Sequence, residues 1–210
     1  MKEKNIPLAL SVLLSSIGNT GSYSLQQLKQ LEEDGNEVLC HELNEAAVGT
    51  AYTNGTLDEE LKNASEQMIA NGFSSKVYVY PSGNITADYN EIKEITKKYF
   101  NYGMNVNLGK TYCDVNEYAK TEGFWNTCPL VDKMNIARMP IETGHMDQSW
   151  YVLKIEQAIK ENGYLCLYMH SYLDNFSLEE LKKVVNHIIS LKHNVKFMTP
   201  TKAMEYIESL

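Results

Sequence analysis

The chain has 210 residues, of which 43% are hydrophobic, 22% charged and 10% aromatic. This length and composition predict one globular domain over residues 1–210, and they exclude a disordered chain or a small disulfide scaffold. The formal net charge is -8 and Arg138 is the only arginine, so we expect no nucleic-acid partner, which would need a concentrated positive surface.

Short apolar segments of strand length alternate along the chain with amphipathic stretches of helix length. This alternation predicts an α/β fold with a parallel sheet. In chain order, the expected elements are a strand over 6–13, a helix over 24–33, a strand over 37–41, a helix over 57–71, a strand over 76–80, a helix over 89–100, strands over 104–108 and 134–139, a helix over 149–161, a strand over 164–169, a helix over 177–192, a strand over 195–198 and a helix over 201–208.

Several boundary signals support these elements. Ser24 and Ser177 are good helix N-caps, and Gly35 and Gly72 stop helices just before strands. Residues 110–132 show no clear period and are expected to form a long packed loop. No run of 18 apolar residues predicts a transmembrane segment, and the first twenty residues lack the pattern of an export signal.

The four cysteines stand far apart in the sequence, without the close spacing of a zinc knuckle or a redox dithiol. We expect buried thiols at Cys40, Cys113, Cys128 and Cys166. A disulfide between Cys113 and Cys128 is the only local alternative.

In βα architectures, active-site groups gather at the carboxyl ends of the strands. Two histidines, with carboxylates nearby, follow separate predicted strands. Such side chains can bind a metal ion or act as general acids and bases. The residues to examine after the strand ends are His41, Glu42, Asn44, Glu45, Pro81, Ser82, Gly83, Asn84, Pro140, Glu142, His145, Asp147, Trp150, His170, Ser171 and Asp174.

Each candidate has a functional and a structural interpretation. His41 and Glu45 are four residues apart and could bind one zinc ion, or they could be ordinary polar residues at a strand end. His170 could act as a general acid or base, or it could bond to a loop backbone. Arg138 could clamp a carboxylate or a sugar, or it could form a buried ion pair. Motifs for a serine elbow, a dinucleotide loop or a P-loop are missing.

Three stretches together resemble the polysaccharide deacetylase family, also called the NodB-homology or carbohydrate esterase family 4 domain. The first runs from Asn5 through the helix that starts at Ser24 to His41, and it ends in Gly35-Asn36-Glu37-Val38-Leu39-Cys40-His41. The second is Tyr80-Pro81-Ser82-Gly83. The third is Gly163-Tyr164-Leu165-Cys166-Leu167-Tyr168-Met169-His170.

The resemblance implies a distorted (β/α)7-type barrel and a bacterial hydrolase of carbohydrate metabolism, acting on non-peptide C–N bonds. In this family a divalent metal, often zinc, activates the water that removes acetyl groups from a polysaccharide. By resemblance, His41 and Glu45 would bind the metal and His170 would be the catalytic acid. The substrate would lie against Tyr80, Pro81, Ser82, Arg138 and Trp150, with the Ser82 backbone N–H at the oxyanion.

The chain departs from the family pattern at several positions. By this comparison we expect the chain to lack the family's first strand, which ends in an Asp-Asp pair, and Glu45 replaces the second metal histidine. Val79 and Ser82 replace the arginine and tyrosine of the third motif, and Tyr168 replaces the leucine of the last motif. A shortened barrel has exposed sheet edges, through which a homo-oligomer could form.

These departures keep a second interpretation open, in which the chain is a non-catalytic glycan-binding or structural relative. Tyr80, Trp150 and Tyr172 would then stack on sugar rings. A small-molecule enzyme on an unrelated βα fold is a third possibility. In the first two cases the expected partner is an acetylated polysaccharide or oligosaccharide, and the family suggests an exported or cell-envelope location.

Overall fold

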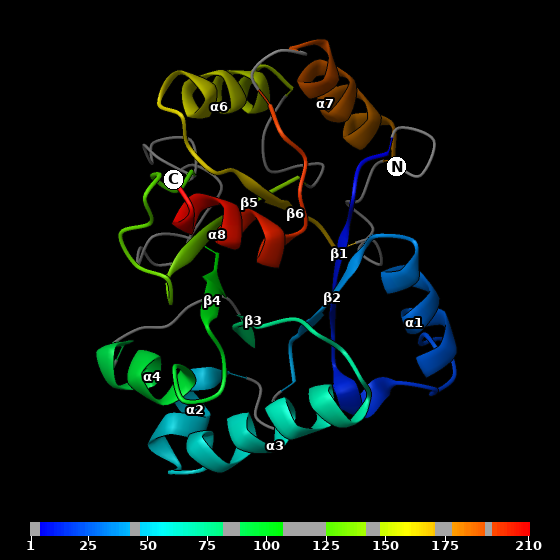
Figure 1. Ribbon diagram of the computed structural model, residues 1–210, viewed down its shortest axis with the longest axis vertical. Coiled ribbons are helices and arrows are strands. Elements are labelled where there is room, and N and C mark those ends of the chain that lie inside the picture. Colours follow the sequence, from blue (N-terminus) through cyan, green and yellow to red (C-terminus); the bar gives the residue numbers. More distant parts are fainter. Residues whose placement is uncertain are drawn as a thin grey trace.

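The structure is a computed structural model that describes residues 5–42, 47–81, 89–106, 125–141, 148–170, 178–191 and 195–210. In these ranges six parallel strands form one curled sheet, and each strand pairs with the next along the chain (Figure 1). The predicted α/β class and barrel-type curl are confirmed. The strands are β1 (Ala9–Val12), β2 (Glu37–Cys40), β3 (Val77–Val79), β4 (Tyr102–Asn105), β5 (Ile136–Pro140) and β6 (Cys166–Tyr168).

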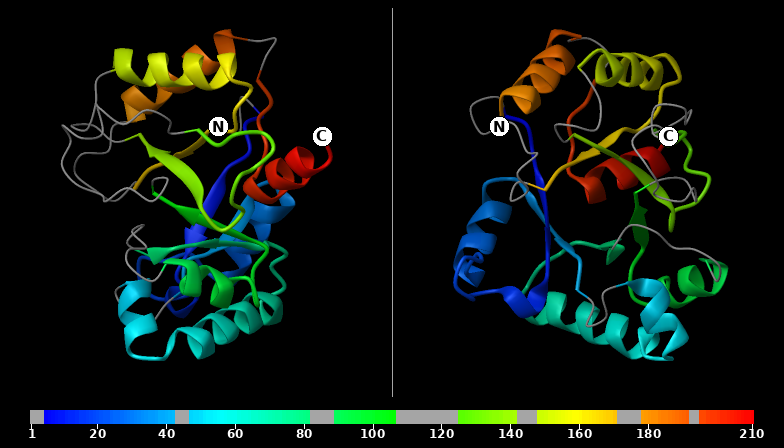
Figure 2. Two further views of the ribbon diagram at one scale, coloured as in Figure 1. Left: turned by 90° about the vertical axis from the view of Figure 1, so that its left-hand side faces the viewer. Right: turned by 180° about the vertical axis from the view of Figure 1, so that it is seen from behind.

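Helices connect the strands and lie around the outside of the curl (Figures 1 and 2). Parallel neighbours need such crossover connections. The helical segments are η2 (Leu14–Ser16), α1 (Leu25–Glu33), α2 (Val48–Thr53), α3 (Leu57–Ala70), α4 (Tyr89–Thr96), α6 (Gln148–Lys160), α7 (Leu178–Ser190) and α8 (Pro200–Glu208). The predicted helices are confirmed with small shifts at their ends, whereas α2 was not predicted.

One predicted strand, over residues 195–198, is wrong. These residues are irregular and lead directly into α8. Their side chains do alternate, since Val195 packs on the α6–α7 cluster and Met198 packs on the cluster inside the curl. Within the described ranges no strand pairs with this segment, however, so the alternation does not become part of the sheet.

Alternate residues of the strands face opposite layers, as the period of two requires. On the outer side, Cys40, Tyr78 and Tyr80 pack with helices α1 to α4 in one buried cluster. On the inner side, Leu39, Val79 and Met104 pack with α8. A third cluster joins Met139 and Ile141 at the end of β5 to helices α6 and α7. The inner face is therefore the one that lines the interior of the curl.

Unlike the other helices, α8 lies across one end of the curl, near the amino end of β2 (Figures 1 and 2). Its side chains Ala203, Met204 and Ile207 are buried against the inner face. At its first turn, Thr201 donates its backbone N–H to Glu37 Oε2 over 3.0 Å, and its hydroxyl bonds to Glu37 Oε1. A buried carboxylate at a helix N-terminus is favourable, because the helix dipole is positive there.

Both ends of α1 form as the sequence predicts. Ser24 caps α1 in a full capping box with Gln27, and Gly35 ends that helix with a φ of +89°. Only glycine adopts this backbone region at little cost. Ser177, the other predicted cap, lies outside the described residues.

Three of the four cysteines lie in the described residues. Cys40, Cys128 and Cys166 are free thiols, and Cys40 is buried. Cys113 lies outside the described residues, so the alternative disulfide stays a prediction.

Among the described helices, none has the length and apolar character needed to span a bilayer.

Candidate functional site

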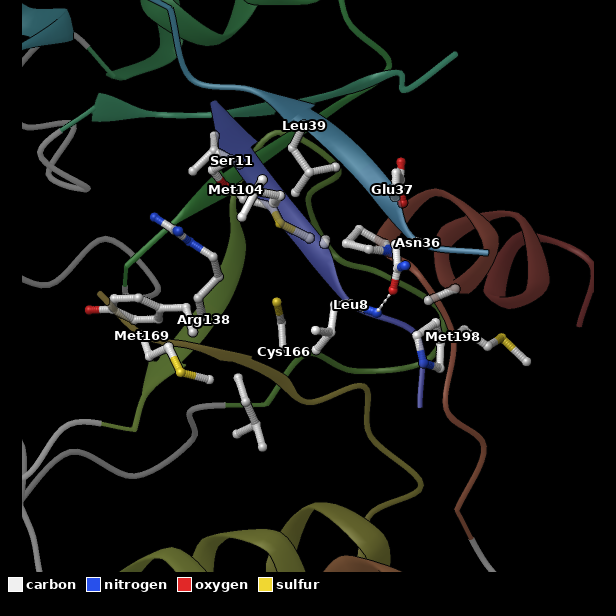
Figure 3. Close-up of a pocket in the computed structure, with 18 of the residues that line it drawn as sticks. Leu8, Ser11, Asn36, Glu37, Leu39, Met104, Arg138, Cys166, Met169 and Met198 are labelled. Carbon is white, nitrogen blue, oxygen red and sulfur yellow. Dashed lines mark hydrogen bonds between the residues drawn. The ribbon is translucent and has the colours of Figure 1, made fainter. Parts of the chain in front are cut away.

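A cavity of about 1980 Å³ occupies the inside of the curl and is lined by residues of all six strands. Figure 3 shows part of this lining, with Leu39, Met104, Arg138 and Cys166 among the labelled residues. The described part of the curl is open between β1 and β6, since β1 pairs only with β2 and β6 only with β5 there. His41, Tyr80, Arg138 and His170 all line this cavity, so the fold brings together four of the candidates that the sequence identified.

His41 follows the last residue of β2 and is half-buried. Its Nδ1 lies 2.7 Å from the backbone oxygen of Val79 on β3. Because a carbonyl oxygen only accepts, Nδ1 carries the proton and Nε2 carries the lone pair. The neighbouring strand thus fixes both the ring orientation and the tautomer of His41, as partners behind metal-binding histidines commonly do.

The pKa of His41 is lowered from its ordinary value. Burial is the largest cause, because it disfavours the charged imidazolium, and the charges of Arg138 and His170 lower the pKa further. The hydrogen bond to Val79 and the charge of Glu42 act in the opposite direction. At neutral pH the imidazole is therefore neutral, which is the form that binds a metal.

Arg138 lies in the middle of β5 and is 8% exposed. Its Nε donates to the backbone oxygen of Asn105 over 3.2 Å, at the end of β4. The guanidinium carbon lies 4.8 Å from the centre of the Tyr168 ring. The only arginine of the chain is thus held inside the cavity, where its charge acts on His41.

His170 comes two residues after the end of β6 and is half-buried. Its ring centre lies 5.7 Å from that of Tyr168, and the two ring planes are nearly perpendicular at 88°. Because the charge of His170 contributes to the pKa of His41, the two histidines share one electrostatic environment. Both histidines line the same cavity.

Tyr168 was not predicted as a site residue, and Glu42 was predicted only as a polar residue after a strand end, without a role. Tyr168 faces the inside of the curl and contacts both Arg138 and His170. Glu42 is 8% exposed and accepts the backbone N–H of Ser15 over 3.0 Å, while its own carbonyl oxygen accepts the hydroxyl of Tyr78. The period of two along β6, which places residues 166 and 168 on one face, is the signal that could have found Tyr168.

Tyr80 does not offer its ring to a ligand in this structure. Its side chain is 0% exposed and packs at a right angle to Tyr78 in the outer cluster, at a centre distance of 5.4 Å. The sequence placed Tyr80 in the cleft because it follows a strand. Pro81 is buried as well. Tyr80 is among the residues that line the cavity, but its ring is buried in the outer cluster, so a substrate contact through this ring stays a prediction.

Trp150 lies in the first turn of α6 and is half-buried. Its ring packs edge to face against Tyr151 at 5.3 Å, and Lys154 Nζ lies 5.7 Å from its centre. Lys154 is itself only 6% exposed and also lies 6.0 Å from the ring of Trp125. Trp150 thus belongs to an aromatic and cationic cluster on α6, and it is not among the residues that line the cavity.

Glu45 and Ser82 lie outside the described residues, and so do Glu142, His145, Asp147 and Asp174. Among the residues that are described, no group of three or more His, Cys, Asp or Glu side chains could hold a metal. A catalytic zinc site uses about three protein ligands. The described part of the chain therefore fits a metal through one well-oriented imidazole, that of His41, and further ligands would have to come from the remaining residues.

Comparison with known proteins finds similarity among solved structures. No family model matches the sequence, and no curated protein matches it. Among solved structures, the chain is similar to a protein from Mycobacterium smegmatis provisionally named as a polysaccharide deacetylase, with a TM-score of 0.66 and 13% sequence identity. The match covers 99% of this chain and 73% of the other. At this identity the likeness concerns the fold, and it supports the conclusion that the chain folds as a curled (β/α) barrel of the kind found in that protein.

Proposed function

We propose that this protein is a metal-dependent hydrolase that removes acetyl groups from a glycan. The observation that carries the proposal is the placement of His41 and His170 along one cavity inside the curled sheet, with His41 in the neutral form and held by Val79. The fold shared with the protein provisionally named as a polysaccharide deacetylase supports the same class of reaction.

In this proposal each residue has a separate role. His41 binds a divalent metal through Nε2, and Glu45 is the second protein ligand. The metal, with zinc as the first candidate, would supply Lewis-acid activation of water. Arg138 lies beside the histidines in the cavity and orients the acetylated sugar, Pro81 contacts the substrate, and the backbone N–H of Ser82 donates to the acetyl oxygen.

The reaction itself is a hydrolysis. Water adds to the acetyl carbonyl carbon and loses one proton to the solvent, which later returns a proton to His170. The bond from that carbon to the glycan nitrogen or oxygen breaks, and acetic acid leaves and ionises to acetate. His170 donates a proton to the departing nitrogen or oxygen, which otherwise would leave as a poor anionic leaving group. A positioned general acid typically contributes about 10²–10⁴-fold to the rate.

The experiment is an assay of acetate release from acetylated chito-oligosaccharides and O-acetylated glycans, with and without added Zn²⁺. We expect turnover that requires the metal and that falls at least about 10²-fold in His170→Ala. His187→Ala is the matched control, because His187 lies on α7 and does not line the cavity. Zinc-dependent release that is equal in His170→Ala and His187→Ala would contradict the role of His170.

The second candidate function is a glycan-binding module without catalysis. It is favoured by the finding that the described residues hold no group of three metal-binding side chains. Trp150 would then stack on a sugar ring, as half-buried aromatic residues can. Binding of acetylated oligosaccharide by calorimetry, without acetate release at any metal concentration and with loss of affinity in Trp150→Ala, would favour this second function.

A further inference from the structure

We propose that Tyr168 is a positioning residue, which fixes the imidazole plane of His170 through ring contacts that are anchored on the Arg138 guanidinium. This inference rests on the proposed role of His170 as the acid. It gives a role to Tyr168, which stands where the family that the sequence resembles has a leucine.

The sheet places the two anchors on one face. Arg138 pairs with Cys166 and Pro140 pairs with Tyr168 in the parallel ladder between β5 and β6. Positions 138, 166 and 168 therefore point to the same side, which is the inside of the curl. The backbone of Tyr168 is held in addition by the N–H of Ile141, which donates to its carbonyl oxygen over 2.8 Å.

Arg138 is itself a fixed support for the tyrosine ring. It is 8% exposed, its Nε bonds to Asn105, and its guanidinium carbon lies 4.8 Å from the Tyr168 ring centre. Guanidinium groups are attracted to aromatic faces at this distance, more strongly where water is excluded. The tyrosine ring therefore has a preferred position before any substrate arrives.

His170 lies two residues beyond the last residue of β6. Its ring meets the Tyr168 ring at 5.7 Å and 88°, which is the edge-to-face geometry that aromatic pairs prefer. A general acid must hold its proton within hydrogen-bond reach of the leaving atom. The contact with the Tyr168 ring favours one orientation of the imidazole and so helps to meet this requirement.

The contact uses the ring of Tyr168 and needs nothing from its hydroxyl group. The aromatic variant Tyr168→Phe should therefore keep the function, while Tyr168→Leu should lose it although it keeps an apolar side chain of moderate size. Replacing Arg138 by lysine keeps the charge but removes the planar group that stacks on the ring, so Arg138→Lys should show part of the same loss.

The test combines a spectroscopic and a kinetic readout on the full chain. Histidine ring signals are recorded by NMR on protein with ¹³C/¹⁵N-labelled histidine, and His170→Ala assigns the signal of interest. In Tyr168→Phe we expect unchanged His170 ring shifts. In Tyr168→Leu we expect ring-proton shifts close to those of free histidine and greater ring mobility, with kcat lowered about tenfold to a hundredfold and KM within about twofold.

Tyr206→Leu is the matched control, because Tyr206 also contacts a cation, Lys196 at 4.0 Å, but does so on α8. It should leave the His170 signals unchanged. Unchanged His170 signals in folded Tyr168→Leu would overturn the proposal, and so would unchanged kcat. If the unmodified protein releases no acetate, the proposed function fails, whereas the NMR comparison still decides whether Tyr168 orients His170.

Discussion

Replacing Glu37 by alanine should destabilise the protein strongly, because this carboxylate fixes the first turn of α8 at the amino end of β2. Glu37 is 6% exposed and accepts both the backbone N–H and the hydroxyl of Thr201. A hydrogen bond to a charged group contributes about 1.5–3 kcal/mol, and a carboxylate at a helix N-terminus contributes about 0.3–1 kcal/mol more. The Thr201 hydroxyl can turn to another acceptor, so we expect a loss of about 2–4 kcal/mol rather than the full sum.

The assay is equilibrium unfolding in urea, followed by circular dichroism. Glu33→Ala is the matched control, because Glu33 is exposed at the end of α1 and its loss should change the unfolding free energy by less than about 0.5 kcal/mol. Thr201→Val removes only the hydroxyl and should cost less than Glu37→Ala. The double variant should show coupling of about 0.5–3 kcal/mol. A Glu37→Ala loss no larger than that of Glu33→Ala would refute this account of how α8 is held.

Two further predictions concern the sheet. Gly103→Ala should lower the unfolding free energy by about 1–3 kcal/mol in urea titrations, because a Cβ there would lie 2.5 Å from the hydroxyl of the buried Tyr80 ring, and a wild-type midpoint would refute it. Burial raises the pKa of Cys40 to about 12 from an ordinary 9.0, so the unfolded chain ionises first and the unfolding free energy should fall as pH rises from about 9 towards 12. Cys40→Ala should show a shallower fall, and equal slopes would contradict the buried thiol.

The strands and helices were largely predictable because each carries a local pattern. Apolar runs that are covered on both faces mark β2 to β5, and the Ser24 cap and the Gly35 stop mark the ends of α1. Helix α2 carries no such signal. Val48 and Ala51 bury it against the outer core although its sequence contains glycine and β-branched residues, so tertiary packing overrides weak propensity there.

The sequence predicted site residues well where a residue's position after a strand brings it to the site. It predicted them less well where the direction of the side chain determines whether the residue reaches the site. His41 and His170 were found because parallel strands bring their carboxyl ends together. Tyr80 lines the cavity as predicted, but its ring is buried beside Tyr78 in the outer cluster, and its position after a strand does not reveal that ring direction. The contact between Tyr168 and Arg138 depends on strand register, which the sequence alone does not give.

The most direct test of the proposed metal site is calorimetric titration of Zn²⁺ into chelator-treated protein, beside His41→Ala and the control His187→Ala. The account predicts one tight zinc site per chain, which is retained in the control and lost in His41→Ala. The reason is that Nε2 of His41 is the proposed metal ligand, and the contact of Nδ1 with the Val79 oxygen orients its ring. Absence of zinc binding in protein shown to be folded, or equal binding in His41→Ala, would contradict a metal-dependent hydrolase built on this histidine.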